Sequence, residues 1–497
     1  MKKDKNMEEE KGRHVVIVGA GPGGCLTAIN FARRGWQVTL IERGEDFSSV
    51  DLTVNKSWMI GLGTIGISAL KKVPGLWDAV SDTAIPNKGI IYLFGKKTMR
   101  EDNIPGIEAF TVDRNYVTGS LLKFLIANHG SDPKLKCMFN TSLMYVDGQN
   151  KSITVKSQTS PAQEISYDLL IGADGYRSVV RNSLFSQHRN FACSNSSIFL
   201  NIKSLYIKTP KDYEVPYFYF ILGSGIKNAS GFALAGPNGS INMGFSFPEH
   251  LPVDPELLSN DPEVLYAYFK KNFTHWELDM DFCRDFAKSR WYRTGQVKCN
   301  FYHMGVNEGT ALLLGDAAHA TSPALGLGMN TALADAQALD EMMEQHKESL
   351  DTVLPTFSER RVKEGIALTD MSFNLFHVVP SRNYWSSIKD IIRNSLHRAS
   401  GGRVNPPGMI VATQEDSSDC LSRGFKLCSS QGILDTFRVE NEKLTREHFE
   451  RAVGLREHTK SSALARQQAR AIEDGDISSL QVTRRLKMTE ETKEADQ

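Results

Sequence analysis

A glycine-rich turn between a short apolar strand and a helix constrains the fold of this chain more than any other feature. Residues 15–41 predict a strand, a helix and a second strand, and Gly19, Gly21 and Gly24 give the first turn the spacing G-x-G-x-x-G. Such glycines make the turn tight, let a pyrophosphate approach the backbone and let the helix pack closely. Glu42 ends the second strand, where its carboxylate can accept hydrogen bonds from an adenosine ribose. The set predicts a dinucleotide site, of NAD or of FAD, rather than a turn without a ligand.

The composition is that of an ordinary globular protein of two or three domains. The chain has 497 residues, of which 41% are hydrophobic and 23% are charged, and its formal net charge is zero. A neutral chain gives no sign of nucleic acid or of an anionic membrane as a partner. The mixed-charge start has no apolar signal region, and no apolar run approaches the roughly 20 residues of a spanning helix. We therefore expect a cytoplasmic protein without a transmembrane segment, with association to an organelle surface as an alternative.

The cysteines predict a reducing compartment. Seven of them are scattered singly from Cys25 to Cys428, and no C-x-x-C spacing occurs. An odd number without paired spacing favours reduced thiols, with neither a disulfide framework nor a metal site.

A second glycine-flanked carboxylate follows further along the chain. Residues 167–181 predict a buried strand, a turn with Asp174 between two glycines, and a helix that carries Ser178 and Arg181. One interpretation is that Asp174 only caps the helix. The spacing D-G-x-x-S-x-x-R is more specific than a cap requires, and it favours a binding turn.

A third stretch places another carboxylate at the end of a strand. Residues 312–314 predict a buried strand, and Asp316 follows at its carboxyl end, where open α/β sheets bind ligands. Gly326 and Gly328 form a loop, and Asn330 begins a long amphipathic helix. The backbone N–H groups and the dipole of that helix point at whatever occupies the loop.

Two further regions complete the sequence pattern. Arg114 lies where a short strand meets a helix, and it either decorates the helix start or points at a cofactor diphosphate. Residues 199–247 predict a meandering antiparallel sheet. We expect most of its aromatic side chains to form the core of the sheet, and the alternative is that they line a ligand-binding face. Helices are expected at 354–375 and 386–396, and the chain is polar from 399.

Together the three glycine-containing stretches resemble the single-component FAD-dependent aromatic hydroxylases, a family of flavin monooxygenases. The similarity covers roughly the first 400 residues in matching order. Within the family, residues 111–122 and 358–374 look most like kynurenine 3-monooxygenases. The chain departs from that branch at the segment expected to supply an arginine, which offers only Lys88. Asn374, the asparagine after the D-M-S triplet, is displaced by one position from the pattern of that branch. The apolar membrane-anchoring tail of those enzymes is missing.

The resemblance implies an α/β fold with a Rossmann-type FAD-binding domain and a second domain built on an antiparallel sheet. The expected FAD-binding domain is discontinuous and takes residues 1–80, 106–190 and 296–345. The expected substrate domain takes residues 81–105 and 191–295, C-terminal helices take 346–398, and a polar, partly disordered extension takes 399–497.

The resemblance also assigns roles to residues. Those expected to bind FAD are Gly19, Gly21, Gly24, Glu42, Arg43, Arg114, Asp174, Asp316, Gly328, Met329 and Asn330. Among these, Arg114 would face the diphosphate and Asp316 the ribityl hydroxyls. Pro323 is the expected catalytic residue, beside the flavin edge where oxygen adds. Lys88 and Asn374 are the expected substrate-binding residues, and no metal is expected.

The implied activity is hydroxylation of a small aromatic or electron-rich substrate. NADPH or NADH would reduce the flavin, and O2 would react through a flavin C4a-hydroperoxide, so the hard chemistry belongs to the cofactor. A kynurenine-type substrate is the leading candidate. The alternatives are an FAD-dependent reductase or epoxidase on the same fold, or a flavin-fold binding protein without turnover.

Overall fold

The computed structural model describes residues 13–52, 57–95, 97–103, 108–157, 159–222, 225–249, 251–273, 275–323 and 326–376, apart from the side chains of 187, 196–200 and 370–376. The chain divides into two compact units, Met1–Cys428 and Ser429–Gln497, and every described residue belongs to the first. The helix expected at 386–396 and the extension from 399 lie outside the described residues.

A six-stranded sheet forms the centre of the first half of the fold. Five of its strands run parallel, and β18 pairs antiparallel with β19 at one edge. In spatial order the strands are β18 (His303–Met304), β19 (Ala311–Leu313), β12 (Leu169–Gly172), β1 (His14–Val18), β2 (Gln37–Ile41) and β8 (Leu135–Met138).

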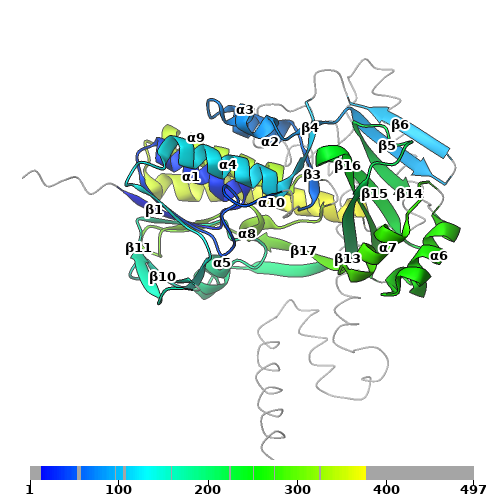
Figure 1. The fold of residues 1–497 in the computed structure, drawn as a ribbon. Coiled ribbons are helices and arrows are strands. Elements are labelled where there is room, and N and C mark those ends of the chain that lie inside the picture. The colour runs from blue at the N-terminus through cyan, green and yellow to red at the C-terminus, as the bar shows by residue number, and fades with distance from the viewer. Residues whose placement is uncertain are drawn as a thin grey trace, which may run out of the picture. The chain divides into compact units, whose positions relative to one another are not determined.

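Both faces of this sheet are covered, which explains why its strands are almost continuously apolar. Helices lie on one face: α1 (Pro22–Arg33), α4 (Arg114–His129), α9 (Gly328–Gln345) and α10 (Leu350–Phe376) (Figure 1). On the other face lie α5 (Val179–Ser183) and a three-stranded sheet of β9 (Thr141–Asp147), β10 (Ser152–Ser157) and β11 (Gln163–Ser166).

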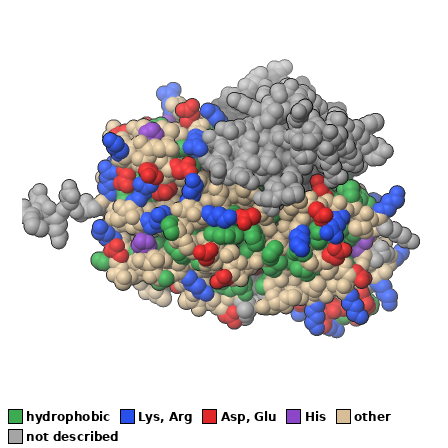
Figure 2. Space-filling view, turned by 90° about the horizontal axis from the view of Figure 1, so that it is seen from above, with side chains coloured by type: hydrophobic (Ala, Val, Ile, Leu, Met, Phe, Trp, Pro, Cys, Tyr) green, Lys and Arg blue, Asp and Glu red, His purple; other side chains and the backbone are tan. Residues whose placement is uncertain are grey.

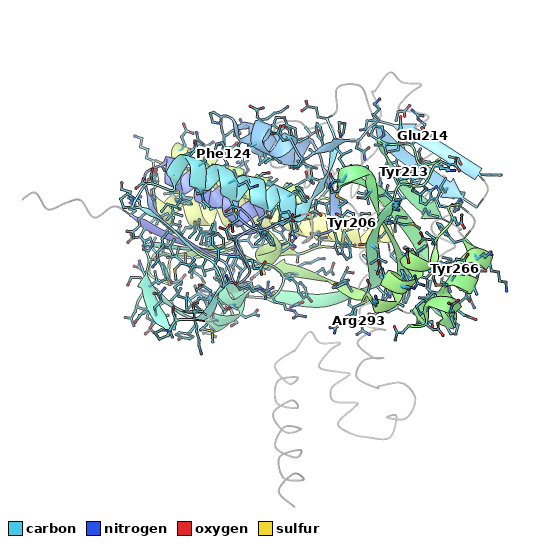
Figure 3. The ribbon with its side chains drawn as sticks, viewed as in Figure 1. Phe124, Tyr206, Tyr213, Glu214, Tyr266 and Arg293 are labelled. Carbon is cyan, nitrogen blue, oxygen red and sulfur yellow. The ribbon has the colours of Figure 1, made fainter. Side chains whose placement is uncertain are left out.

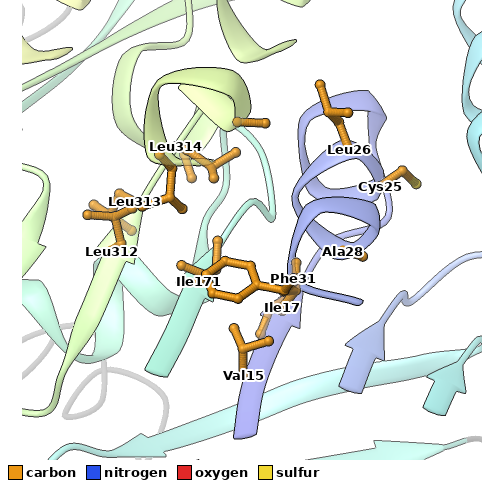
Figure 4. Close-up of a cluster of buried hydrophobic side chains, with 14 of the residues drawn as sticks. Val15, Ile17, Cys25, Leu26, Ala28, Phe31, Ile171, Leu312, Leu313 and Leu314 are labelled. Atoms are coloured by element: carbon orange, nitrogen blue, oxygen red, sulfur yellow. The ribbon is translucent and has the colours of Figure 1, made fainter. Parts of the chain in front are cut away.

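The hydrophobic core between the central sheet and the helices includes the strand and the helix that flank the glycine-rich turn. Val15 and Ile17 of β1 are fully buried, and they pack with Ile171 of β12 and with Leu26 and Phe31 of α1 (Figure 4). Burial of a side chain of this size contributes about 1.5–3 kcal/mol to folding. The strand–helix unit that the sequence predicts is thus held by its own hydrophobic contacts.

A seven-stranded sheet forms the second half of the fold. Its neighbouring strands are antiparallel except for one parallel pair, β14 with β5. The order is β17 (Tyr292–Cys299), β13 (Cys193–Lys208), β16 (Ser240–Pro248), β15 (Ser230–Gly236), β14 (Tyr217–Leu222), β5 (Gly89–Phe94) and β6 (Lys97–Asp102). Two helices, α6 (Pro262–Asn272) and α7 (Met280–Lys288), share a second hydrophobic core with one face of this sheet.

Smaller elements connect the two halves. A three-stranded sheet consists of β3 (Met59–Leu62), β7 (Phe110–Asp113) and β4 (Ile85–Pro86), and α2 (Thr64–Lys71) and α3 (Leu76–Ser81) lie beside it. The short helix α8 (Asp316–His319) follows β19. Among the described residues, 3-10 turns occupy Phe185–Gln187, Pro237–Gly239 and Pro255–Leu258.

The predicted α/β fold, with a Rossmann-type sheet and a second, mainly antiparallel sheet, is confirmed. The residue boundaries of the two predicted domains stay predictions. In the described part of the chain, no helix has the length and apolar character needed to cross a membrane. Basic and acidic side chains are interspersed on the face shown in Figure 2.

Candidate functional site

Gly19 and Gly24 are held by close backbone approaches that leave no room for a side chain. Gly19 has a φ of +102°, and a Cβ there would lie 2.3 Å from the carbonyl oxygen of Ala173, just after β12. A Cβ on Gly24 would lie 2.0 Å from the carbonyl oxygen of Gly19. These contacts let β1, α1 and β12 meet at one point, the carboxyl edge of the central sheet.

Gly21 differs because the space beside it is open. Among the described residues, a Cβ on Gly21 would meet one group within 4 Å, the Nη2 atom of Arg114 at 3.9 Å. Gly21 is also the N-cap of α1, and it has no side chain to satisfy the first N–H groups of the helix. The exposed guanidinium of Arg114 and the positive end of α1 therefore flank the same space, an arrangement that suits an anionic diphosphate.

Glu42 fastens the glycine-rich turn. One carboxylate oxygen accepts a hydrogen bond from the N–H of Ala20 at 2.8 Å, and the other accepts one from the N–H of Gly44 at 2.8 Å. Each oxygen keeps a further lone pair, so the carboxylate can hold the turn and accept a hydroxyl group together. The neighbouring Arg43 is exposed.

Asp174 lies beside Gly19 and supports the second glycine-flanked turn. Its Oδ2 atom accepts hydrogen bonds from the N–H groups of Val179 and Val180 at the start of α5, at 2.6 and 3.2 Å. Burial raises the pKa of this carboxyl group. Ser178 is the N-cap of α5, so the helix start uses both predicted polar residues. The Oδ1 atom of Asp174 has no hydrogen-bond partner, which leaves one acceptor for a ligand.

Arg181 connects the second and third motifs. The side chain is buried, and its guanidinium donates to the carbonyl oxygens of Tyr176 at 2.7 Å and of Ala317 at 2.8 Å. Ala317 belongs to α8, so one arginine joins the turn after β12 to the helix after β19. Its function is to position these loops.

Asp316 lies at the exposed edge of the third motif. It is the first residue of α8 and follows Gly315, which has a φ of +59°. A Cβ placed on Gly328 would lie 3.9 Å from Oδ1 of Asp316. The exposed carboxylate is therefore adjacent to the first residue of α9.

The N-terminus of α9 carries no side-chain cap. The N-cap residue, Leu327, makes no capping hydrogen bond, and the first turn contains no acidic residue. The helix thus presents free N–H groups and the positive end of its dipole. Met329 is half-buried against the first core, and Pro323, the expected catalytic residue, is exposed before the loop.

The side chain of Asn330 bonds to protein groups. The amide oxygen accepts from the N–H of Gly63 at 2.9 Å, and the amide nitrogen donates to the carbonyl oxygens of Gly61 and Gly326. Asn330 thereby fixes β3 and the glycine loop against the start of α9. The backbone N–H of Asn330 is the group that could make the predicted contact with the flavin, because the side chain is already hydrogen-bonded.

A buried ionic cluster behind the site was not predicted from the sequence. Asp335 of α9 lies 2.7 Å from Nε2 of His319 and 2.6 Å from Nε of Arg361, and it accepts from the N–H of Gly315. Burial raises the pKa of the Asp335 carboxyl, but His319 and Arg361 outweigh it and lower the pKa to about 2. The sequence did contain a signal for this cluster, because Asp335 is an aspartate within the apolar helix sequence LADAQAL.

A hydrogen bond between the two halves of the fold was also missed. Tyr206 of β13 donates to Oδ2 of Asp113 at 2.6 Å (Figure 3), and the same carboxylate accepts from the N–H groups of Ser57 and Asn115. Asp113 immediately precedes Arg114. The second sheet therefore helps to fix the start of the helix that carries this arginine.

The aromatic residues of the second sheet divide between its faces. Those packed in the core with α6 and α7 are Tyr217, Tyr219, Phe245 and Phe247. The half-buried ones lie on the opposite face: Tyr92, Phe218, Phe220 and Phe232. Cross-strand partners share a face, and the register links Tyr206 to Asn242, Asn242 to Leu234, Phe232 to Phe220, and Phe220 to Tyr92. This aromatic row therefore shares a face with Tyr206, which bonds to Asp113 at the end of β7.

The expected substrate-binding residues are not brought together by described contacts. Lys88 is exposed between β4 and β5. The pKa of nearby Asp102 is lowered mainly by a hydrogen bond from Arg100, then by Tyr217, with a smaller effect of Lys88. The side chain of Asn374 lies outside the described residues. No group of three His, Cys, Asp or Glu side chains that could hold a metal occurs in the described part of the chain.

Comparison with known proteins decides the family. A family model described as an FAD binding domain matches residues 13–372, well over half of the chain. The chain belongs to this family. The space beside Gly21 agrees with this, because the positive end of α1 and the guanidinium of Arg114 both border it.

Curated relatives span most of the chain. Violacein synthase of Chromobacterium violaceum is 28% identical over 412 residues, which cover 80% of this chain and 92% of that protein. Kynurenine 3-monooxygenase of Legionella pneumophila is 28% identical over 381 residues, which cover 74% and 81%.

Solved structures share the fold. A 2-methyl-3-hydroxypyridine-5-carboxylic acid oxygenase has a TM-score of 0.58 at 19% identity and covers 82% of this chain and 97% of its own. The Klebsiella pneumoniae protein HpxO, complexed with FAD and uric acid, has a TM-score of 0.58 at 16% identity and covers 78% and 95%. The predicted cofactor, FAD, and the predicted class of enzyme, an FAD-dependent monooxygenase, are confirmed.

Proposed function

We propose that this enzyme hydroxylates a small aromatic substrate with O2 and NADPH or NADH. The observation that carries the substrate class is the aromatic row of Tyr92, Phe218, Phe220 and Phe232. It lies on the same face of the second sheet as Tyr206, which bonds to Asp113 beside Arg114, and its members are outside the described hydrophobic core shared with α6 and α7. The relatives named kynurenine 3-monooxygenase support the same class.

The ADP half of FAD is proposed to bind at the glycine-rich turn. The diphosphate would occupy the open space beside Gly21, between the N-terminus of α1 and the guanidinium of Arg114. Glu42 would accept a ribose hydroxyl with its remaining lone pairs. Asp174 would offer its unpartnered Oδ1 atom to the same region.

The flavin half is proposed to bind between α8 and α9. Asp316 would accept hydrogen bonds from ribityl hydroxyls, and the N–H groups of residues 328–330 would face the pyrimidine edge. When bound, FAD supplies the redox chemistry with NAD(P)H and O2. The positive end of α9 stabilises negative charge beside it, and Pro323 would border the reacting edge.

The substrate ring is proposed to pack against the aromatic row. Ring pairs there include Tyr92 with Phe220, stacked with centroids 5.8 Å apart, and Phe218 with Phe220 at 4.3 Å. Such contacts suit a flat aromatic ligand and exclude water from it. Lys88 and Asn374 stay the proposed polar contacts, and Lys88 would pair with a substrate carboxylate.

A substrate screen tests the proposal. FAD-loaded enzyme is mixed with NADPH or NADH in air, and nucleotide oxidation is followed with and without single aromatic compounds, tryptophan derivatives and kynurenine included. We expect at least one aromatic to stimulate oxidation and to gain one oxygen atom by mass. The aromatic assignment is contradicted if only non-aromatic compounds stimulate nucleotide oxidation, or if no compound of a broad aromatic set does.

A further inference from the structure

Two cysteines face each other where a narrow ribbon joins the two halves of the fold. The first residues of β13, Cys193 to Ser197, pair with Gly295 to Cys299 of β17, whereas pairing with β16 begins only at Leu200. Figure 1 shows β13 and β17 running from the second sheet toward α5 and α8. The ribbon is therefore a two-stranded connection at this point.

Cys193 and Cys299 are directly opposite in this ribbon, with their sulfur atoms 3.6 Å apart. Opposite residues of antiparallel strands have Cα atoms about 4.5–5.5 Å apart. A disulfide accepts Cα separations of about 4.4–6.8 Å, so the backbone already has a compatible spacing. Closing the bond requires the two sulfur atoms to approach by about 1.5 Å, which side-chain rotation can supply.

The two thiols differ in a way that suits a stepwise reaction. Cys193 is exposed, whereas Cys299 is buried and donates a hydrogen bond to the sulfur of Cys193. This hydrogen bond, and to a lesser extent the charge of Arg181, lowers the pKa of the Cys193 thiol to about 7. Burial raises the pKa of Cys25 and of Cys137.

We propose that Cys193 and Cys299 form an oxidation site that a peroxide converts to an intramolecular disulfide. The thiolate of Cys193 attacks one oxygen of hydrogen peroxide, which gives a sulfenic acid and releases hydroxide. Cys299 gives up its proton and attacks that sulfur as the thiolate, the S–S bond forms as the S–O bond breaks, and the departing hydroxide takes up the proton as water. The two sulfurs together lose two electrons, which reduce the peroxide.

The site lies next to the loops that position the cofactor. Val297, two residues before Cys299, donates its N–H to the carbonyl oxygen of Ala320 at 2.8 Å, directly after α8. Arg181 joins α8 to the turn after β12. The disulfide would thus cross-link the ribbon beside these loops, without involving any residue proposed to touch FAD.

Peptide mapping of the full chain tests the proposal. The protein is reduced, freed of reductant, treated with a small excess of hydrogen peroxide and blocked with N-ethylmaleimide, and its unreduced peptides are identified by mass. We expect a peptide pair joined through Cys193 and Cys299, the loss of two of the seven blockable thiols, and full reversal by dithiothreitol.

Three variants separate the steps. In Cys299→Ser the oxidation should stop at a sulfenic acid on Cys193 that dimedone traps, and Cys193→Ser should give neither product. Cys137→Ser is the matched control and should keep the cross-link. Recovery of Cys193 and Cys299 as separate maleimide adducts after peroxide treatment, or a Cys193 disulfide to any other cysteine, would overturn the proposal.

Discussion

Gly21 and Gly24 stand three residues apart in one motif, but they restrict substitution for different reasons. A Cβ on Gly24 would collide with a backbone oxygen at 2.0 Å, whereas one on Gly21 would reach only the end of the Arg114 side chain at 3.9 Å. Gly24 is therefore required by the fold. Gly21 leaves space that the fold alone does not use.

This difference gives a paired prediction. Gly21→Ala should leave the melting temperature of the FAD-free protein unchanged and weaken FAD binding at least tenfold, because the methyl group occupies the space proposed for the diphosphate. Gly24→Ala should lower the melting temperature without FAD. Thermal unfolding and fluorescence titration with FAD measure the two effects. FAD affinity equal to the parent's in Gly21→Ala would remove the diphosphate from this space.

A substitution at Asp316 tests the proposed contact with the ribityl chain of FAD. Its exposed carboxylate stands beside the start of α9. Loss of hydrogen bonds to a charged group costs about 1.5–3 kcal/mol, so Asp316→Ala should weaken FAD binding about ten- to hundredfold. The melting temperature of the FAD-free protein should change little. A variant that purifies with full flavin occupancy would show that the ribityl chain binds elsewhere.

At the scale of elements, Asp335 joins α9 to its neighbours. The buried carboxylate bonds to His319 of α8, to Arg361 of α10 and to the N–H of Gly315. One side chain therefore holds α8, which carries Asp316, against α9, whose N-terminus we propose to face the flavin. The free energy of the cluster depends on the charge of Asp335.

Asp335→Ala should destabilise the protein by about 3–5 kcal/mol, because it removes the buried carboxylate that His319 and Arg361 both contact. The folded-state pKa near 2 lies below the unfolded value of about 3.9. The contribution of Asp335 is therefore present above pH 4 and is lost as the pH falls toward 2. Denaturant unfolding between pH 2.5 and 7 measures it. Parent and variant with equal stability at neutral pH would refute the role of the cluster.

Lys203 of β13 has the opposite dependence. It is buried, and its ammonium donates to the carbonyl oxygen of Phe286 in α7 at 2.8 Å. Burial lowers its pKa to about 8, whereas the unfolded value is about 10.4. Between these pH values the unfolded chain binds more protons, so the contribution of Lys203 to stability rises with pH.

Lys203→Met should therefore flatten the rise of the unfolding free energy between pH 8 and 10. Denaturant unfolding across this range measures the slope. Exposed Lys208 of the same strand provides the control, because Lys208→Met should leave the slope as in the parent. An unchanged slope in Lys203→Met would show that Lys203 does not lose its proton in this range.

At the scale of the whole molecule, the sequence predicts what is local and misses what joins distant segments. The β1–α1–β2 unit follows from glycine spacing and apolar periodicity within some thirty residues. The contacts of Tyr206 with Asp113 and of Cys193 with Cys299 join residues about a hundred positions apart. Their geometry depends on how the two sheets meet, which no local pattern encodes.

The candidate site shows the same division. The sequence places Gly21 and Asp316 on turns at strand ends, and the parallel order of the central sheet brings those ends to one edge. Asn330 at the flavin stays a prediction, and the structure adds a role for its side chain, which fastens β3 and the glycine loop. An amide at a helix start has the same sequence pattern in either role, so only the three-dimensional contacts distinguish them.

This chain is an FAD-dependent monooxygenase, and we propose that its substrate is aromatic. The most direct measurement is a turnover under oxygen-18 gas, with FAD-loaded enzyme, NAD(P)H and the aromatic compound that best stimulates nucleotide oxidation. We expect one labelled oxygen atom in the aromatic product and the second oxygen atom of O2 in water. Nucleotide oxidation that yields only hydrogen peroxide with every aromatic compound, or a product whose new oxygen is unlabelled, would contradict it.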